Sequence, residues 1–101
     1  MITRIELEKI HKIVCEKALQ IAIERGDEYS NNTDELRTFR LTGQLFGCEP
    51  SDVAKMQVCL KVARLKNDGK IDTGLDLINY VIYMLILKTE EICKRRMVER
   101  E

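Results

Sequence analysis

Apolar residues recur every three or four positions along most of the chain, which is the spacing of amphipathic helices rather than of strands. The first run predicts a helix from about Thr3 to Arg25, which Gly26 is expected to end. After a loop rich in turn formers, Asn32 and Glu35 have the spacing of a capping box. They predict the start of a second helix, which Gly47 terminates.

Two further helices follow with the same spacing of apolar residues. The third is predicted from about Ser51 to Asn67 and stops at Gly69. The fourth is capped by Asp72 or Thr73 and extends to about Met97. No segment has the alternation of a strand, so the pattern predicts an all-α protein.

Four helices joined by short loops favour a four-helix up-and-down bundle. A chain of 101 residues is expected to form one domain, which here spans residues 1–101. Its end, about residues 88–101, is highly charged and is predicted to be a solvated helical extension of the fourth helix.

The fourth helix is apolar on almost every side except for one polar seam. On a helical wheel Asp72, Asp76, Asn79 and Tyr83 fall within a sector about 60° wide. A surface helix has a broad polar face instead, so this helix must be covered on most sides. A second subunit is the natural cover, which predicts a homo-oligomer, at least a dimer. The alternative is a helix at the centre of the monomer.

The third helix carries a similar stripe, which includes Gln57, Lys61 and Arg64. A short loop makes the third and fourth helices antiparallel neighbours, so Lys61 and Arg64 are expected to meet Asp72 and Asp76. Two interpretations remain open. The stripes form an internal salt-bridge network, although desolvation offsets most of the attraction in such pairs. Alternatively, they line a pocket for a polar ligand.

The residue types of the second interpretation suit a nucleotide. Lysine and arginine bind phosphate oxygens, a carboxylate and an amide recognise a base or ribose edge, and aromatic rings stack on a base. The candidate ligand-binding residues are Lys61, Arg64, Asp72, Asp76, Asn79, Tyr29, Tyr80, Tyr83 and Phe39.

Composition narrows the range of partners. Seventeen basic and seventeen acidic residues balance, which argues against a dedicated binder of duplex nucleic acid or of a membrane surface. No signal peptide is visible, and the longest apolar stretch, Leu75 to Leu87, is too short to cross a bilayer. A cytoplasmic protein is expected, with its four cysteines reduced and buried.

The ordered segments GDEY, TFRLTGQLF, DVAKMQVCLKVARL and DTGLDLINYVIYM resemble a group of small phage proteins of uncharacterised function. That group is similar to the MazG-like, all-α NTP pyrophosphatase superfamily. The resemblance implies a MazG-like fold, a dimer or tetramer, and glutamate-rich helices that hold magnesium ions against a triphosphate. This chain departs from that pattern, because Lys61 and Arg64 stand where glutamates are expected. Asp72 and Asp76 are the remaining acidic pair.

Three hypotheses follow from the residues and the resemblance together. The leading one is a non-catalytic nucleotide binder without a cofactor, such as a phage-encoded anti-defence sponge for a cyclic nucleotide or ADP-ribose-type immune signal in the host cytoplasm. An alternative is a Mg²⁺-dependent NTP pyrophosphatase, with the metal on Asp72 and Asp76 and the leaving phosphate on Lys61 and Arg64. A third is a helical module that binds another protein.

Overall fold

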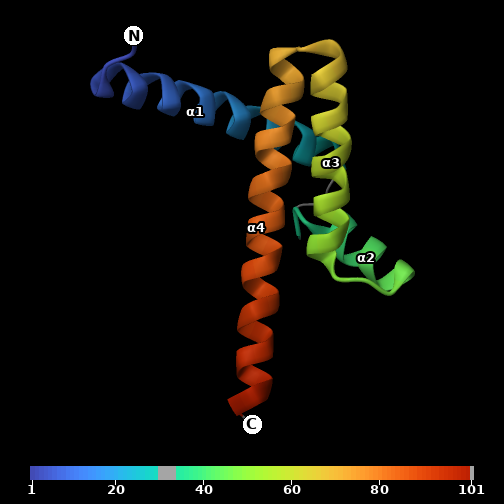
Figure 1. Ribbon diagram of the computed structural model, residues 1–101. Helices are drawn as coiled ribbons and strands as arrows, with labels where there is room; N and C mark the ends of the chain where they lie inside the picture. The colour runs from blue at the N-terminus through green and yellow to red at the C-terminus, as the bar shows by residue number, and fades with distance from the viewer. Residues whose placement is uncertain (30–33, 101) are drawn as a thin grey trace.

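The computed structural model describes residues 1–29 and 34–100, and the side chains of residues 1–26 and 34–99 (Figure 1). The elements are α1 (Arg4–Tyr29), α2 (Arg37–Phe46), α3 (Pro50–Asp68) and α4 (Ile71–Arg100). The part of the chain that is described contains no strand. The predicted all-α class is therefore confirmed.

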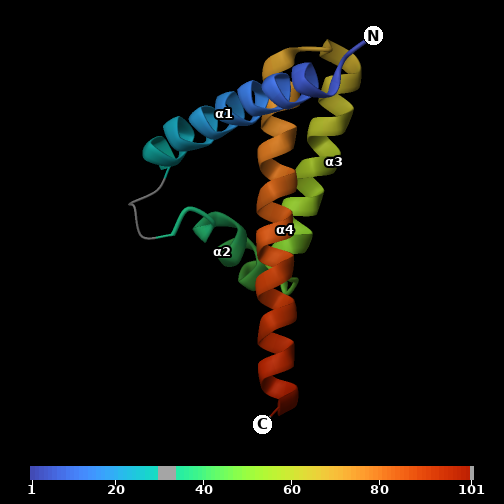
Figure 2. The same cartoon turned by 90° about the vertical axis from the view of Figure 1, so that its left-hand side faces the viewer.

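The helices α3 and α4 form an antiparallel hairpin, which Figures 1 and 2 show from two sides. Gly69 ends α3 in the left-handed conformation, with φ of 59°, and its N–H donates to the Leu65 carbonyl. The Asp68 carboxylate holds the turn by accepting the Lys70 N–H at 2.9 Å and the Thr73 hydroxyl at 3.0 Å. The sequence predicted this reversal at Gly69 correctly.

The start of α3 is fixed by a residue of α4 rather than by its own cap. The N-cap residue Glu49 makes no side-chain cap hydrogen bond. Instead, the buried Glu91 carboxylate accepts the Ser51 N–H at 3.0 Å and the Ser51 hydroxyl at 2.6 Å. A carboxylate at a helix N-terminus satisfies a backbone donor and complements the helix dipole. This contact sets the register of α3 against α4.

The first helix crosses α4 steeply instead of lying along it (Figures 1 and 2). This differs from the predicted up-and-down order. At the crossing, Ala18 is buried with 1% of its surface exposed. The Asn79 side-chain amide donates to the Ala18 carbonyl over 2.8 Å. A small residue allows this close approach, and the N-terminal half of α1 projects beyond α4.

Two predicted boundaries between α1 and α2 need correction. Gly26 does not end α1, which continues to Tyr29; the glycines with positive φ in the described segments are Gly47 and Gly69. The start of α2 has no capping box, because Glu35 precedes a helix that begins at Arg37. The other half of that box, Asn32, lies outside the described residues. The Asp34 carboxylate accepts the Leu36 N–H at 3.0 Å instead.

The core lies where α2 sits against the α3–α4 hairpin. It consists of the buried residues Leu36, Phe39, Ala54 and Leu87, with Val53, Tyr80, Tyr83 and Met84 packed against them. Much of the apolar surface of α1 and α4 lies outside this small core. The cysteines Cys15, Cys48, Cys59 and Cys93 are exposed in the single chain, contrary to the prediction of buried thiols. No helix among the described residues is long and apolar enough to cross a membrane.

Candidate functional site

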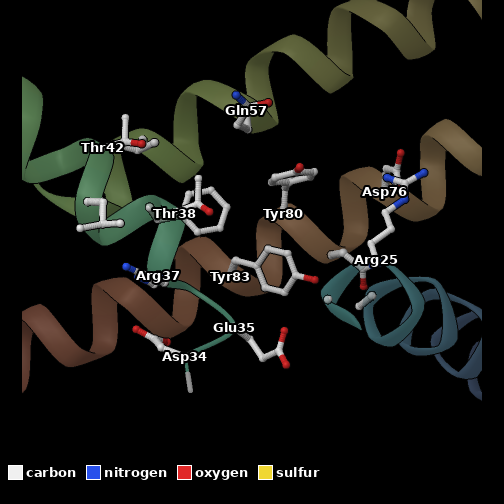
Figure 3. Close-up of a pocket in the computed structure, with 16 residues that line it drawn as sticks. Arg25, Asp34, Glu35, Arg37, Thr38, Thr42, Gln57, Asp76, Tyr80 and Tyr83 are labelled. Carbon is white, nitrogen blue, oxygen red and sulfur yellow. Dashed lines mark ion pairs between the residues drawn. The ribbon is translucent and has the colours of Figure 1, made fainter. Parts of the chain in front are cut away.

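A pocket of about 750 Å³ opens between the C-terminal part of α1, α2, and the middle of the α3–α4 hairpin (Figure 3). Its volume lies within the range of roughly 300–1,000 Å³ that is typical of small-molecule sites. In the view of Figure 3, Tyr80 and Tyr83 lie between the threonines of α2 and the pair Arg25–Asp76. Asp76, Asn79 and Tyr83 of the polar seam of α4 line this pocket.

Asp76 is a buried carboxylate with a cation on each oxygen. The guanidinium of Arg25, from α1, lies 2.5 Å from Oδ1. The Lys61 amine, from α3, lies 3.7 Å from Oδ2 and 5.5 Å from the centroid of the Tyr80 ring. A buried charge is tolerated when it is paired in this way. Asp76 thus joins three helices at one end of the pocket.

Three aromatic rings form the apolar side of the pocket. The ring centroids of Phe39 and Tyr80 are 6.0 Å apart, those of Phe39 and Tyr83 5.9 Å, and those of Tyr80 and Tyr83 5.7 Å. The Tyr80 ring is nearly perpendicular to Phe39, at 86°. Edge-to-face contacts of this kind hold each ring in place. A fixed aromatic surface suits a flat heteroaromatic ligand.

The hydroxyl of Tyr83 points into the pocket (Figure 3). Burial raises the pKa of Tyr83, and the neighbouring Tyr80 and Glu35 raise it further. The hydroxyl therefore stays protonated at neutral pH and is available as a hydrogen-bond donor.

The structure brings together most of the candidates that the sequence singled out. Phe39, Asp76, Asn79, Tyr80 and Tyr83 all line the pocket. Lys61 lies immediately behind them, against Asp76 and Tyr80. The side chain of Tyr29 lies outside the described part of the chain.

Arg64 and Asp72 do not take the places expected for them. Both side chains are exposed, and neither lines the pocket. Arg64 lies one turn beyond Lys61. The hydrogen bond from the Lys70 N–H is the main cause of the lowered pKa of Asp68, and the Thr73 hydroxyl and the charges of Lys70 and Arg64 lower it further. The expected meeting of Arg64 with Asp72 and Asp76 is therefore wrong, and Arg25 provides the second cation at Asp76.

Arg25 was not among the predicted site residues, because the first helix was expected to lie along the others in an up-and-down bundle. The sequence does indicate the face on which Arg25 lies, because Ala18, Ala22 and Arg25 follow one another at helical spacing. They form a helix face of small residues with a charged residue at its end. The pocket also includes Gln57, which lay in the predicted stripe of α3, and Thr38 and Thr42 of α2, which no pattern indicated.

The charge of the pocket is nearly balanced. Its lining contains the arginines Arg25 and Arg37 and the carboxylates Asp34, Glu35 and Asp76. Lys61 adds a third positive charge from behind Asp76. A site with this balance suits a ligand that carries donors as well as negative charge.

A magnesium site of the pyrophosphatase type does not fit the residues present. Asp72 is exposed and outside the pocket, and both oxygens of Asp76 face cations. Among the side chains of residues 1–26 and 34–99, no three His, Cys, Asp or Glu gather closely enough to hold a metal ion. Mg²⁺ prefers several oxygen ligands in an octahedral arrangement.

Comparison with models of known protein families, with curated proteins and with solved structures finds no match to this chain.

Proposed function

We propose that this protein is a non-catalytic nucleotide-binding protein that acts as a homo-oligomer. The observation that carries the proposal is the pocket of about 750 Å³ with three interlocked aromatic rings and a buried, doubly paired Asp76. The rings provide a stacking surface for a base. Arg25 and Arg37 provide forked donors for phosphate oxygens.

The charge balance selects among nucleotides. A nucleoside triphosphate brings a concentrated negative charge, which enzymes match with magnesium and several cations. This pocket offers two lining arginines against three carboxylates. It suits a nucleotide with fewer negative charges and with ribose hydroxyls or base N–H groups that Asp34 and Glu35 can accept. Cyclic nucleotides and ADP-ribose-type signals are of this kind.

A protein that binds such a signal without converting it acts as a sponge. We place this one on a MazG-like scaffold encoded by a phage, where it sequesters an immune signal of the host cell. The scaffold and the origin rest on the resemblance of the ordered segments around Lys61 and Asp76. The two cations that face the oxygens of Asp76 favour capture over metal-dependent hydrolysis.

Isothermal titration calorimetry tests the proposal with a panel of cyclic mononucleotides, cyclic dinucleotides, ADP-ribose and nucleoside triphosphates. One of the first three classes should bind, and Tyr80→Ala should weaken its binding by at least about tenfold, because base–aromatic stacking contributes roughly 1–3 kcal/mol. Arg64→Ala, outside the pocket, serves as the control and should bind normally. Silence across the panel from the folded protein would contradict the proposal and favour a protein-interaction module.

The same panel separates binding from hydrolysis. The ligand should be recovered unchanged after incubation with magnesium. Pyrophosphate release from a triphosphate that Asp76→Asn abolishes would instead favour the pyrophosphatase alternative, with Asp76 as a metal ligand.

A further inference from the structure

The face of α1 that packs on α4 continues well beyond the crossing. Leu7 lies on the same side of α1 as the buried Ala18, because it precedes Ala18 by three turns, and Ile10 lies at the edge of this side, about 80° around the helix from Ala18. In the single chain Leu7 is 52% exposed and Ile10 is 47% exposed. This part of α1 is the arm that projects beyond α4 in Figure 1.

The corresponding face of α4 also continues without a cover. Leu75 and Asn79 are buried where α1 crosses. Ile82 and Ile86 follow them on the same side of α4, and they are 45% and 44% exposed. Two apolar stripes thus leave the crossing, one along α1 toward its N-terminus and one along α4 toward its C-terminus.

The single chain exposes more surface than a compact protein of its mass. The protein exposes 8309 Å², whereas a folded monomer of 11.8 kDa exposes roughly 5,900 Å². Its radius of gyration is 16.0 Å, compared with about 13 Å for a compact chain of this length. The excess, about 2,400 Å² for each chain, lies at the upper end of the roughly 1,000–2,500 Å² that each subunit of an obligate dimer buries.

We infer that a second copy of this chain covers both stripes in a two-fold dimer. The α1 arm of each copy lies on the exposed Ile82–Ile86 stripe of the other. Leu7 lies about 16 Å along α1 from Ala18, and Ile86 lies about 10 Å along α4 from Asn79. Both stripes are apolar, and a two-fold axis pairs each arm with the other copy's stripe simultaneously.

The dimer also affects the pocket, and this part of the inference rests on the proposed function. The C-terminal part of α1 supplies Arg25 to the pocket. Beyond the crossing, the arm has no other helix of its own chain to pack on within the described residues. The partner's α4 fixes the arm and thereby holds Arg25 beside Asp76.

Sedimentation equilibrium without any ligand tests the interface, so its outcome does not depend on nucleotide binding. The wild type should have twice the mass of one chain at micromolar concentration. Ile10→Glu and Ile86→Glu should each raise the dissociation constant of the dimer at least about tenfold, because each places a charge in the interface. The control is Lys12→Glu, which also introduces a glutamate on the arm but on the opposite side of α1, and it should leave the dimer intact.

Photo-crosslinking identifies the pairing where a variant fails to fold. Benzoylphenylalanine at position 10 in unlabelled chains, mixed and refolded with ¹⁵N-labelled chains, should give mixed crosslinks to the segment around Ile82 and Ile86. A wild type that sediments as a monomer overturns the inference. So do crosslinks confined to one chain, or mixed crosslinks that reach another face.

Discussion

The guanidinium of Arg25 lies 2.5 Å from the carboxylate of Asp76, and this contact links the crossing helix α1 to the polar seam of α4. Lys61 approaches the other oxygen of Asp76 from α3. One buried carboxylate therefore holds together the three helices that enclose one end of the pocket. Its removal affects both stability and the shape of the site.

Asp76→Leu should lower the free energy of unfolding by about 2–3 kcal/mol. The substitution leaves the Lys61 amine, whose side chain is only 14% exposed, without its carboxylate. Arg25 is half exposed and can turn to water, so the cost stays below that of a fully buried pair. Urea unfolding measures the change, and the exposed Arg64→Leu, expected within about 0.5 kcal/mol of wild type, is the control. Equal costs for the two variants would contradict the geometry.

The contact between Glu91 and Ser51 should be a main determinant of how α3 is placed. Glu91→Ala removes the acceptor for the backbone N–H and for the hydroxyl of Ser51. We expect a loss of about 2–3 kcal/mol, since hydrogen bonds to a charged group are strong and a buried donor is left unpaired. Ser51→Ala keeps the backbone bond and should cost about 1 kcal/mol. Chemical denaturation of both variants, with the exposed Glu99→Ala as control, measures the difference.

Two glycines should respond to alanine in opposite directions. A Cβ on Gly43 would lie 2.7 Å from the Cys48 carbonyl oxygen and 3.2 Å from the Pro50 nitrogen, both backbone atoms that cannot easily move. Gly43→Ala should therefore destabilise the protein by about 1–3 kcal/mol. Gly74 has open space around it inside α4, so Gly74→Ala should stabilise it by about 0.5–1 kcal/mol. Thermal unfolding of the pair tests the packing of α2 against the start of α3.

The sequence predicted local structure well, because local structure depends on nearby residues. Gly47 and Gly69 end helices where their positive φ is needed. Three of the four seam residues of α4, Asp76, Asn79 and Tyr83, line the pocket, whereas Asp72 does not. These features follow from helical periodicity and from the conformational freedom of glycine alone.

The position of α1 could not be predicted in the same way. A helix with an apolar face can pack along another helix or across it, and periodicity does not distinguish the two. The crossing depends on the small size of Ala18 and on the bond from Asn79 to its carbonyl, a contact between residues far apart in the chain. For the same reason Arg25, rather than Arg64, pairs with Asp76.

Stability should fall in acid partly because of the cluster around Arg40. Arg40 bonds Asp34 at 2.6 Å and Glu90 at 2.7 Å, which joins α2 to the loop before it and to α4. The bond from Arg40 lowers the pKa of Glu90 from its usual 4.5. Burial alone would raise the pKa of Asp34, but the hydrogen bonds from Arg40 and the Leu36 N–H lower it below 3.8. Because both pKa values are depressed in the fold, their contribution is present above about pH 4.5 and is lost as the pH falls through the lower folded values.

Carboxyl ¹³C NMR measures the titration of Asp34 and Glu90 directly. Arg40→Gln should return both pKa values toward 3.8 and 4.5, and should flatten the decline of the melting temperature below pH 5. Lys55→Gln, a charge removed from an exposed site on α3, should leave both titrations unchanged. Unaltered titrations in Arg40→Gln would show that the cluster does not persist in solution.

Tyr83 should titrate later than an ordinary tyrosine. Burial in the pocket, together with Tyr80 and Glu35 nearby, raises its pKa above 10.0. Ionisation is thus easier in the unfolded chain, and the contribution of Tyr83 to stability is complete below pH 10 and declines as the pH rises through the folded pKa. Absorbance at the tyrosinate band should show a late titration step, and Tyr83→Phe should remove it. A ligand that stacks in the pocket excludes more water and should move this titration step to still higher pH. If the ligand binds and the step does not move, the binding site lies elsewhere.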